Sequence, residues 1–259
     1  MQKVTIRKIL KKKNKTPIVC LSAYSKAIAQ IADKYCDIIL VGDSLGMVLY
    51  GMKTTREVEI ETMILHAKTV KDFTRKSLVV FDMPYKTYSN KFIAYKNAKK
   101  VMRLTKCDAI KLEGGKKIVN IIKYLTKRKI PVMGHVGLLP QISINFKVKG
   151  KKFAQKKQIF NDAKAISKSG VFAMVIECVV EDLAKEITRS VSVPTIGIGA
   201  SKYCDGQIVV TDDLLGLSDF SPRFVKKYSN LKKVVEKSIK NYSREVKLRR
   251  FPSYKNVYR

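Results

Sequence analysis

The chain has 259 residues, of which 46% are hydrophobic and 29% are charged, a balance typical of a globular protein and unlike that of a disordered chain. This length fits one or two domains, and a single α/β barrel of about 200–250 residues is among the alternatives. The net charge of +32 is spread along the chain and comes mainly from lysine, which favours a compositional bias over a specific nucleic-acid site.

Short apolar runs recur along the chain, and most are followed by a segment with helical spacing. Continuous apolar runs of this length are typical of strands buried on both faces of a parallel sheet. The predicted strands are Ile18–Leu21, Ile38–Val41, Leu78–Phe81, Ala109–Leu112, Val132–Gly134, Ala173–Ile176 and Thr195–Ile198, with an eighth around Gln207–Val210. Because strands and helices alternate and no GxGxxG motif follows the first strand, the pattern favours a (β/α)8 barrel over an open doubly wound sheet.

The segments between the strands carry apolar stripes at helical spacing. Helices are predicted over residues 60–73, 118–125 and 159–166, and Gly170 is placed to end the last of them. Each stripe would pack one side of its helix against the strands. The sequence therefore predicts the α/β fold class.

The end of the chain carries one more helical pattern. Asn230 is a candidate N-cap for a helix over about residues 230–247, which has an apolar stripe of its own. We expect this stripe to be buried by docking of the helix. Residues 1–259 are therefore expected to form one barrel domain with a docked C-terminal helix.

Targeting and redox signals are weak in this sequence. The longest uncharged stretch, residues 130–146, contains two prolines and falls short of the ~20 apolar residues that a membrane helix needs. The first residues contain no apolar run of the secretory type. The five cysteines are far apart and form no CxxC pair, so we expect them to be reduced. These features predict a cytoplasmic protein without a membrane contact.

Four carboxylates stand where predicted strands end: Asp43, Asp82, Glu113 and Glu177. Because the carboxyl ends of barrel strands converge on one site, we expect these side chains to meet there. Clustered anions repel one another, and a divalent cation would remove that repulsion. An oxygen-only donor set favours Mg²⁺ over zinc. Any one of these acids could instead cap a helix or pair with a lysine.

Lys111 and the two histidines are further candidates. Lys111 stands two residues before Glu113 and so faces the same side of the strand. A buried lysine needs a carboxylate or an anionic ligand, so it either contacts substrate or forms a structural ion pair. His135 closes the fifth strand, where it either binds a ligand or contacts the adjacent loop. His66 lies near an apolar helix stripe and is interpreted as structural.

Ordered sequence blocks between about residues 22 and 224 resemble one known family. The blocks are Val41–Val48, Asp82–Tyr85, Lys111–Gly115, Gly134–Leu138, Pro140-Gln141, Glu177-Cys178, Ile196–Ala200 and Cys204–Gln207. Any one of them is weak evidence, but the set in this order is highly specific. Together they resemble the ketopantoate hydroxymethyltransferase (3-methyl-2-oxobutanoate hydroxymethyltransferase) family.

The resemblance implies an activity. The family transfers a hydroxymethyl group from 5,10-methylenetetrahydrofolate to 3-methyl-2-oxobutanoate, giving 2-dehydropantoate and tetrahydrofolate in the first step towards pantothenate and coenzyme A. It also implies a (β/α)8 barrel of the phosphoenolpyruvate/pyruvate superfamily, dependence on Mg²⁺, small-molecule substrates and a homo-oligomer, expected to be a decamer.

The resemblance also assigns roles to residues of this chain. Asp43 and Asp82 correspond to direct Mg²⁺ ligands, and Glu113 to a ligand that acts directly or through water. Glu177 corresponds to the proton acceptor that generates an enolate. The implied substrate-binding residues are Asp43, Ser44, Asp82, Lys111 and His135.

Two other functions remain open from the sequence. One is a different Mg²⁺-dependent enzyme of the same superfamily that cleaves a C–C bond, from which folate dependence would separate the chain. The other is a basic nucleic-acid-binding or scaffold protein, which the four rim acids disfavour because carboxylates repel phosphates. The segment 144–150 is shorter than the family's loop and lacks its paired glycines, which leaves closure over substrate and subunit contacts open.

Overall fold

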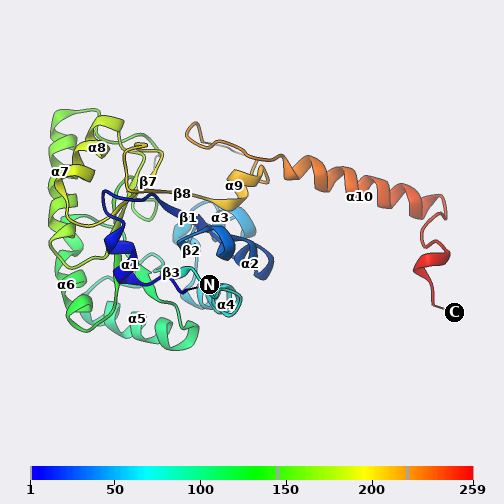
Figure 1. The fold of residues 1–259 in the computed structure, drawn as a ribbon, viewed down its shortest axis with the longest axis horizontal. Coiled ribbons are helices and arrows are strands. Elements are labelled where there is room, and N and C mark those ends of the chain that lie inside the picture. Colours follow the sequence, from blue (N-terminus) through cyan, green and yellow to red (C-terminus); the bar gives the residue numbers. More distant parts are fainter. Residues whose placement is uncertain (1, 144–145, 220–221, 259) are drawn as a thin grey trace. The chain divides into compact units, whose positions relative to one another are not determined.

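The computed structural model describes residues 2–143, 146–219 and 222–258. Eight parallel strands form a closed barrel (Figure 1). They are β1 (Ile18–Ser22), β2 (Ile38–Val41), β3 (Leu78–Asp82), β4 (Ala109–Lys111), β5 (Val132–Gly137), β6 (Ala173–Glu177), β7 (Thr195–Ile198) and β8 (Gly206–Val209). Each strand pairs with the next in the chain, and β8 closes the barrel on β1. The predicted (β/α)8 barrel and all eight predicted strands are confirmed.

The described helices are α1 (Ile6–Lys11), α2 (Lys26–Tyr35), α3 (Leu45–Tyr50), α4 (Ile60–Asp72), α5 (Lys91–Thr105), α6 (Val119–Lys127), α7 (Phe153–Ser167), α8 (Glu181–Ser190), α9 (Thr211–Leu215) and α10 (Leu231–Lys247), with single 3₁₀ turns η1 (Thr55–Glu57), η2 (Lys116–Ile118) and η3 (Tyr254–Asn256). Helices from α2 to α8 lie between successive strands in the chain and cover the outside of the barrel, whereas α1 precedes β1, and α9 and α10 follow β8. The predicted helices are confirmed as α4, α6, α7 and α10. Helix α7 begins at Phe153, before the predicted start at residue 159. Residues 153–158 are exposed or half-buried, so they carry no apolar stripe from which the start could be predicted.

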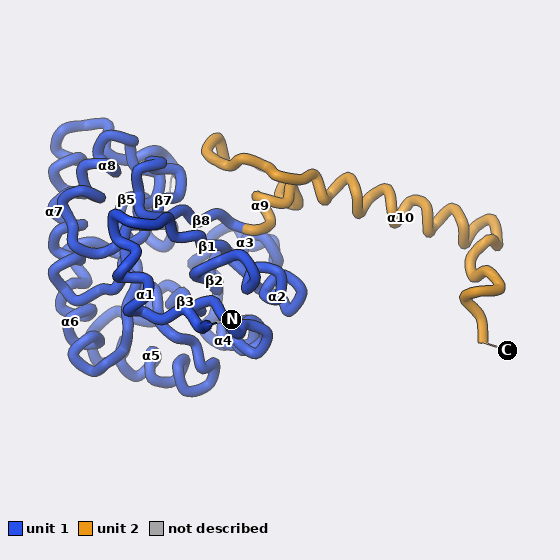
Figure 2. Tube along the Cα trace, viewed as in Figure 1, with its two compact units in different colours: residues 1–210 blue, residues 211–259 orange. Residues whose placement is uncertain are grey.

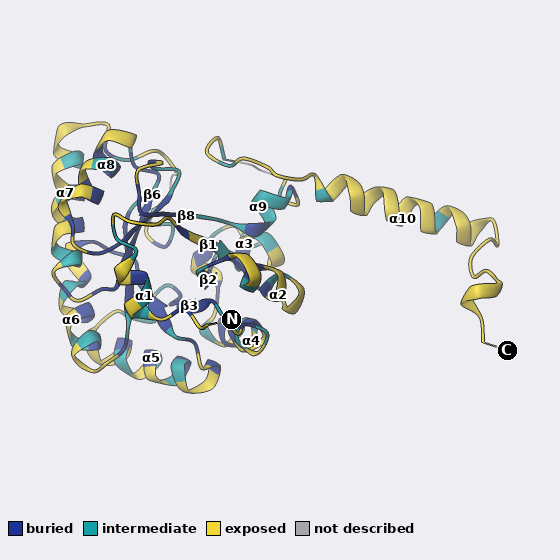
Figure 3. Cartoon of the chain, viewed as in Figure 1, coloured by how far each residue is buried: buried dark blue, intermediate teal, exposed yellow. Residues whose placement is uncertain are grey.

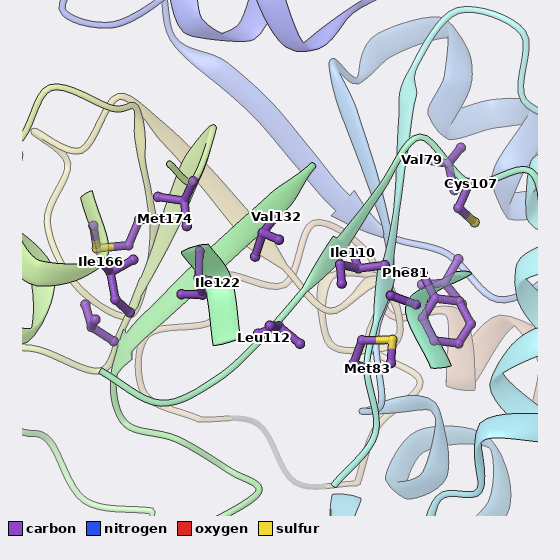
Figure 4. Close-up of a cluster of buried hydrophobic side chains, with 14 of the residues drawn as sticks. Val79, Phe81, Met83, Cys107, Ile110, Leu112, Ile122, Val132, Ile166 and Met174 are labelled. Atoms are coloured by element: carbon purple, nitrogen blue, oxygen red, sulfur yellow. The ribbon is translucent and has the colours of Figure 1, made fainter. Parts of the chain in front are cut away.

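The strands are buried on both faces, as continuous apolar runs require. One set of alternate residues, including Ile38, Leu78 and Val80, fills the barrel interior. The other set packs against the surrounding helices, and Figure 4 shows part of it around Phe81 and Ile110. Burial in Figure 3 accordingly concentrates in the strands and on the inner sides of the helices.

The first residues of the chain close the amino-terminal end of the barrel through ion pairs. Lys3 pairs with Asp108, which precedes β4, at 2.8 Å. Lys12 and Lys13 pair at 2.7 and 2.8 Å with aspartates that precede β2 and β8, namely Asp37 and Asp205. The segment that contains α1 is therefore tied to three strands at the end of the barrel opposite the predicted site.

These ties make part of the stability depend on pH. Burial alone would raise the pKa of Asp108, but hydrogen bonds from Lys3, Lys71 and the Val79 amide outweigh it and lower that pKa below 3.8. The stabilisation is therefore present above about pH 4 and is lost as the pH falls through the folded-state pKa. We expect Asp108→Asn to be less stable than wild type at pH 6, with the difference shrinking below about pH 4 in urea titrations. A difference that is constant across this range would contradict the assignment.

The chain divides into two compact units, residues 1–210 and residues 211–259 (Figure 2). The barrel forms the first unit, and α9 and α10 belong to the second. The Asn230 side chain accepts a hydrogen bond from the Lys233 amide at 3.4 Å, which confirms the predicted cap. However, α10 has no buried residue, whereas the sequence predicts a buried apolar face. Its docking, and the single-domain organisation, stay predictions.

Two further expectations concern the whole chain. All five cysteines are buried and free, in agreement with the expected reduced state. Among the described residues, no helix is long and apolar enough to cross a bilayer. Part of the segment 144–150 falls outside the described residues, namely Ile144 and Asn145. The effect of its shortening therefore stays open.

Candidate active site

The four predicted acids lie at the carboxyl end of the barrel. Asp82 and Glu177 are the last residues of β3 and β6, while Asp43 and Glu113 each stand two residues beyond a strand. One carboxylate oxygen from each of Asp43, Asp82 and Glu113 lies within 4.8 Å of the other two, and all three residues are buried. The predicted convergence is therefore confirmed for these three acids. Glu177 is connected to them through His135.

Lys111 supplies the positive charge inside this cluster. Its Nζ lies 2.8 Å from both carboxylate oxygens of Asp82 and 3.2 Å from Oε1 of Glu113. Burial disfavours the charged ammonium, but the neighbouring carboxylates outweigh this effect and raise the pKa of Lys111 well above its ordinary value. Lys111 is therefore charged at neutral pH. The ion pair that the sequence leaves as one alternative is present.

The pKa shifts of the three acids differ. Burial raises the pKa of Asp43 well above its ordinary value, and the charges of Asp82 and Glu113 raise it further. Burial also raises the pKa of Asp82, although Lys111 opposes the shift. Burial acts on Glu113 in the same direction, but the Lys111 and His135 charges outweigh it and lower the pKa of Glu113 to about 2. Lys111 and His135 thus leave the cluster incompletely neutralised, and burial together with the remaining repulsion acts most strongly on Asp43.

His135 lies between two carboxylates that come from different strands. Its Nδ1 is 3.2 Å from Oε1 of Glu113, and its Nε2 is 3.3 Å from Oε2 of Glu177. Neither contact has hydrogen-bond geometry, so the attraction is that between charges. Burial lowers the pKa of His135, but the Glu113 charge outweighs it and the pKa rises to about 9. The sequence leaves a ligand or a loop as its partner, whereas the structure shows two acids.

Ser44 and His66 are connected through Tyr24. Ser44 precedes α3, and its Oγ lies 2.8 Å from the hydroxyl of Tyr24. His66 on α4 contacts the backbone oxygen of Tyr24 through Nδ1 at 2.7 Å, and the hydroxyl of Tyr50 through Nε2 at 2.9 Å. His66 thus fixes the segment that supports Ser44, which agrees with its interpretation as a structural histidine.

Two residues at the site were not predicted from the sequence. The Gln141 side chain donates to Oδ2 of Asp43 at 2.7 Å, and the Tyr88 hydroxyl donates to Oε1 of Gln141 at 2.5 Å. Gln141 stands within a sequence block that resembles the family, but no role followed from that position. Tyr88 lies between β3 and α5, and an isolated tyrosine in such a loop carries no comparable signal.

Comparisons with known proteins place the chain in a family. The family model described as ketopantoate hydroxymethyltransferase matches residues 3–254. The chain is 54% identical over 253 residues to 3-methyl-2-oxobutanoate hydroxymethyltransferase of Pelagibacter ubique, with 98% of each chain covered. It is 47% identical over 263 residues to the enzyme of the same name from Rhizobium etli, covering 100% of this chain and 96% of the relative.

Solved structures resemble the chain in fold. A 2,3-dimethylmalate lyase, described as a PEP mutase/isocitrate lyase superfamily member, has a TM-score of 0.64 at 12% identity, covering 98% of this chain and 88% of the lyase. Phosphonopyruvate hydrolase in complex with oxalate and Mg²⁺ also has a TM-score of 0.64 at 12% identity, covering 99% of this chain and 93% of the hydrolase. At this identity the likeness shows the barrel fold alone. The family model and the relatives together show that this chain is an enzyme that belongs to the ketopantoate hydroxymethyltransferase family.

Proposed function

We propose that this enzyme transfers a hydroxymethyl group from 5,10-methylenetetrahydrofolate to 3-methyl-2-oxobutanoate, giving 2-dehydropantoate and tetrahydrofolate. The relatives carry the name of this activity. The observation that carries the proposal is the cluster of three buried carboxylates around Lys111, with a fourth carboxylate across His135. Such a cluster suits a reaction in which negative charge develops on a bound oxo-acid.

The acid cluster fits a magnesium ion. Asp43, Asp82 and Glu113 offer only oxygen donors, which a hard cation prefers. Burial and the charges of Asp82 and Glu113 hold the pKa of Asp43 well above its ordinary value despite Lys111, so a further cation would relieve repulsion that is already present. When bound, Mg²⁺ would supply electrophilic stabilisation of negative charge on the oxo-acid oxygens.

The remaining side chains of the site have separate roles toward the oxo-acid. Lys111 is placed to attract its oxygens, and Ser44 to orient them through the hydroxyl that Tyr24 holds. Glu177 is the base that removes the C3 proton. It lies at the end of β6 beside the cluster, and its side chain is 17% exposed, so it is accessible to a substrate. His135, charged and between Glu177 and Glu113, keeps the base carboxylate oriented.

Assay of product formation tests this function. The full-length protein is mixed with 3-methyl-2-oxobutanoate, and 2-dehydropantoate is measured with and without Mg²⁺ and with and without 5,10-methylenetetrahydrofolate. We expect product only when both additions are present, and we expect a chelator to abolish turnover that Mg²⁺ then restores. Cleavage of a C–C bond in a 2-methylcitrate-like substrate, without folate, would instead identify a lyase.

We also propose that the enzyme acts in the cytoplasm as a homo-oligomer. On helix α10, the side chains of Ile239 and Tyr242 are 61% and 57% exposed. Apolar surface of this kind is typical of a subunit contact. For a decamer, light scattering is expected to give a mass of about ten times the 29.4 kDa of one chain. A stable monomer at working concentration would contradict the proposal.

A further inference from the structure

Gln141 connects two of the proposed metal ligands and is itself fully buried. Its side-chain nitrogen, Nε2, donates to Oδ2 of Asp43 at 2.7 Å. Its backbone amide donates to Oε2 of Glu113 at 3.2 Å. One residue therefore engages one oxygen on each of two carboxylates that come from different strands.

The orientation of the Gln141 amide follows from its neighbours. Besides Asp43, Nε2 faces the backbone oxygen of Met83 at 3.0 Å, so both of its hydrogens meet acceptors. On the other side, Oε1 accepts from the Tyr88 hydroxyl. A reversed amide would place Oε1 against a carboxylate and a carbonyl, which repel it. Tyr88 thus fixes which atom of Gln141 points at Asp43.

The backbone of Gln141 is held as well. Nε of Arg56 donates to its carbonyl oxygen at 2.9 Å, and Nη2 of the same arginine donates to the oxygen of Ile142 at 2.6 Å. Every polar group of Gln141 therefore has a partner, and the residue is rigidly placed. Buried polar networks in which every group is paired are rigid, so Gln141 holds the Asp43 carboxylate in one orientation.

The contacts leave one oxygen of the acid cluster open. Of the six carboxylate oxygens on Asp43, Asp82 and Glu113, five accept from a protein group. The sixth is Oδ1 of Asp43, which has no partner among the residues that the structure describes. An accepting carboxylate oxygen keeps a second lone pair and can still bind an ion, but the bond from Gln141 competes with an ion for the charge and the orientation of Oδ2.

The number of oxygens that a carboxylate offers distinguishes two hard cations. Ca²⁺ takes about six to eight oxygen ligands and readily binds carboxylates through both oxygens, whereas Mg²⁺ requires about six in a near-octahedral arrangement. We propose that Gln141, oriented by Tyr88, is a positioning residue that disfavours coordination of an ion through both oxygens of Asp43 and thereby favours Mg²⁺ over Ca²⁺. This inference rests on the metal site of the proposed function.

The test measures binding of the ions alone. MgCl₂ and CaCl₂ are titrated separately into the metal-free full-length protein by calorimetry, and the ratio of the two dissociation constants is compared between variants. Removing a hydrogen-bond partner of a metal ligand typically changes metal affinity by about 10–100-fold. We therefore expect Gln141→Leu to reduce the preference for Mg²⁺ by about tenfold, chiefly because Ca²⁺ gains a second oxygen of Asp43.

Two further variants keep the result interpretable. Tyr88→Phe retains the ring and removes the hydroxyl that orients Gln141 and that also accepts from the backbone amide of Glu113 at 3.3 Å, so it is expected to lower the preference in the same direction but less. Gln30→Leu makes the same change as Gln141→Leu at an exposed position on α2 and is expected to leave the ratio unchanged. If Gln141→Leu does not fold, Tyr88→Phe decides the question.

The contrary outcomes are distinct. Equal weakening of both ions in a folded Gln141→Leu or Tyr88→Phe protein, with an unchanged ratio, would show that Gln141 only supports the loop, and the positioning role would be wrong while the proposed function stood. If the wild-type protein binds neither ion, the metal site is wrong and this inference fails with it. In that case, the assay of 2-dehydropantoate formation without added metal would decide separately whether the proposed transferase activity is correct.

Discussion

Glu177→Gln is expected to slow the exchange of the C3 hydrogen of 3-methyl-2-oxobutanoate with solvent deuterium by about 10²–10⁴-fold, the range typical for loss of a general base. Glutamine keeps the size of the side chain and its ability to contact His135, but it cannot accept the proton. Exchange can be followed by NMR without folate, so the measurement isolates proton removal from hydroxymethyl transfer.

The matched control for this change is Glu181→Gln, the same replacement at an exposed position four residues on, where α8 begins. It is expected to exchange at the wild-type rate. Exchange at the wild-type rate in Glu177→Gln, together with its loss in Asp82→Asn, would place the base elsewhere. Glu177 would then be a structural acid at the end of β6.

Lys111→Met is expected to have the largest effect on folding. Methionine retains most of the volume but removes the ammonium that pairs with both Asp82 and Glu113, which leaves Asp82 without a cationic partner among the described residues. Removing one partner of a buried ion pair typically costs about 3–5 kcal/mol, which urea titration of the metal-free protein would detect. Turnover should also fall, because a charge that attracts the oxo-acid is lost.

A second cation should offset part of this loss. Because Lys111→Met makes the cluster more negative, we expect added Mg²⁺ to stabilise the variant more than the wild type. Lys100→Met is the control, since Lys100 pairs with Glu61 on the surface at 2.7 Å, where such pairs contribute about 0–1 kcal/mol. A stability in Lys111→Met equal to that of the control would mean that the buried acids are protonated without loss.

The barrel was readily predicted because its strands are buried on both faces. Hydrophobic runs such as Ile38–Val41 and Thr195–Ile198 have the same bounds in the sequence and in the structure. The convergence of Asp43, Asp82 and Glu113 was also predictable, since the topology of a barrel brings the carboxyl ends of its strands together.

The contacts of Gln141 and Tyr88 were not predictable in the same way. They depend on how two loops are folded, and neither residue carries a charge or a periodic pattern that would single it out. Similarly, the apolar stripe of α10 predicted a helix with a face to bury, but the stripe alone does not state which surface covers it. Hydrophobic periodicity indicates which face of a segment is apolar, whereas the surface that covers this face is set by the tertiary structure.

The ion pairs that close the amino-terminal end of the barrel also bear on synthesis at the ribosome. Lys3 and Asp108 are 105 positions apart, and Lys13 and Asp205 are 192 apart. Lys13 therefore leaves the ribosome long before Asp205 has been translated. In the same way, β1 cannot pair with β8 until the end of the barrel has been synthesised. Contacts that span so much sequence form late, after most of the loop-closure entropy has been lost. A nascent chain that stops before residue 205 is thus expected to expose an unpaired strand edge and to aggregate, whereas a few further residues allow the ring to close.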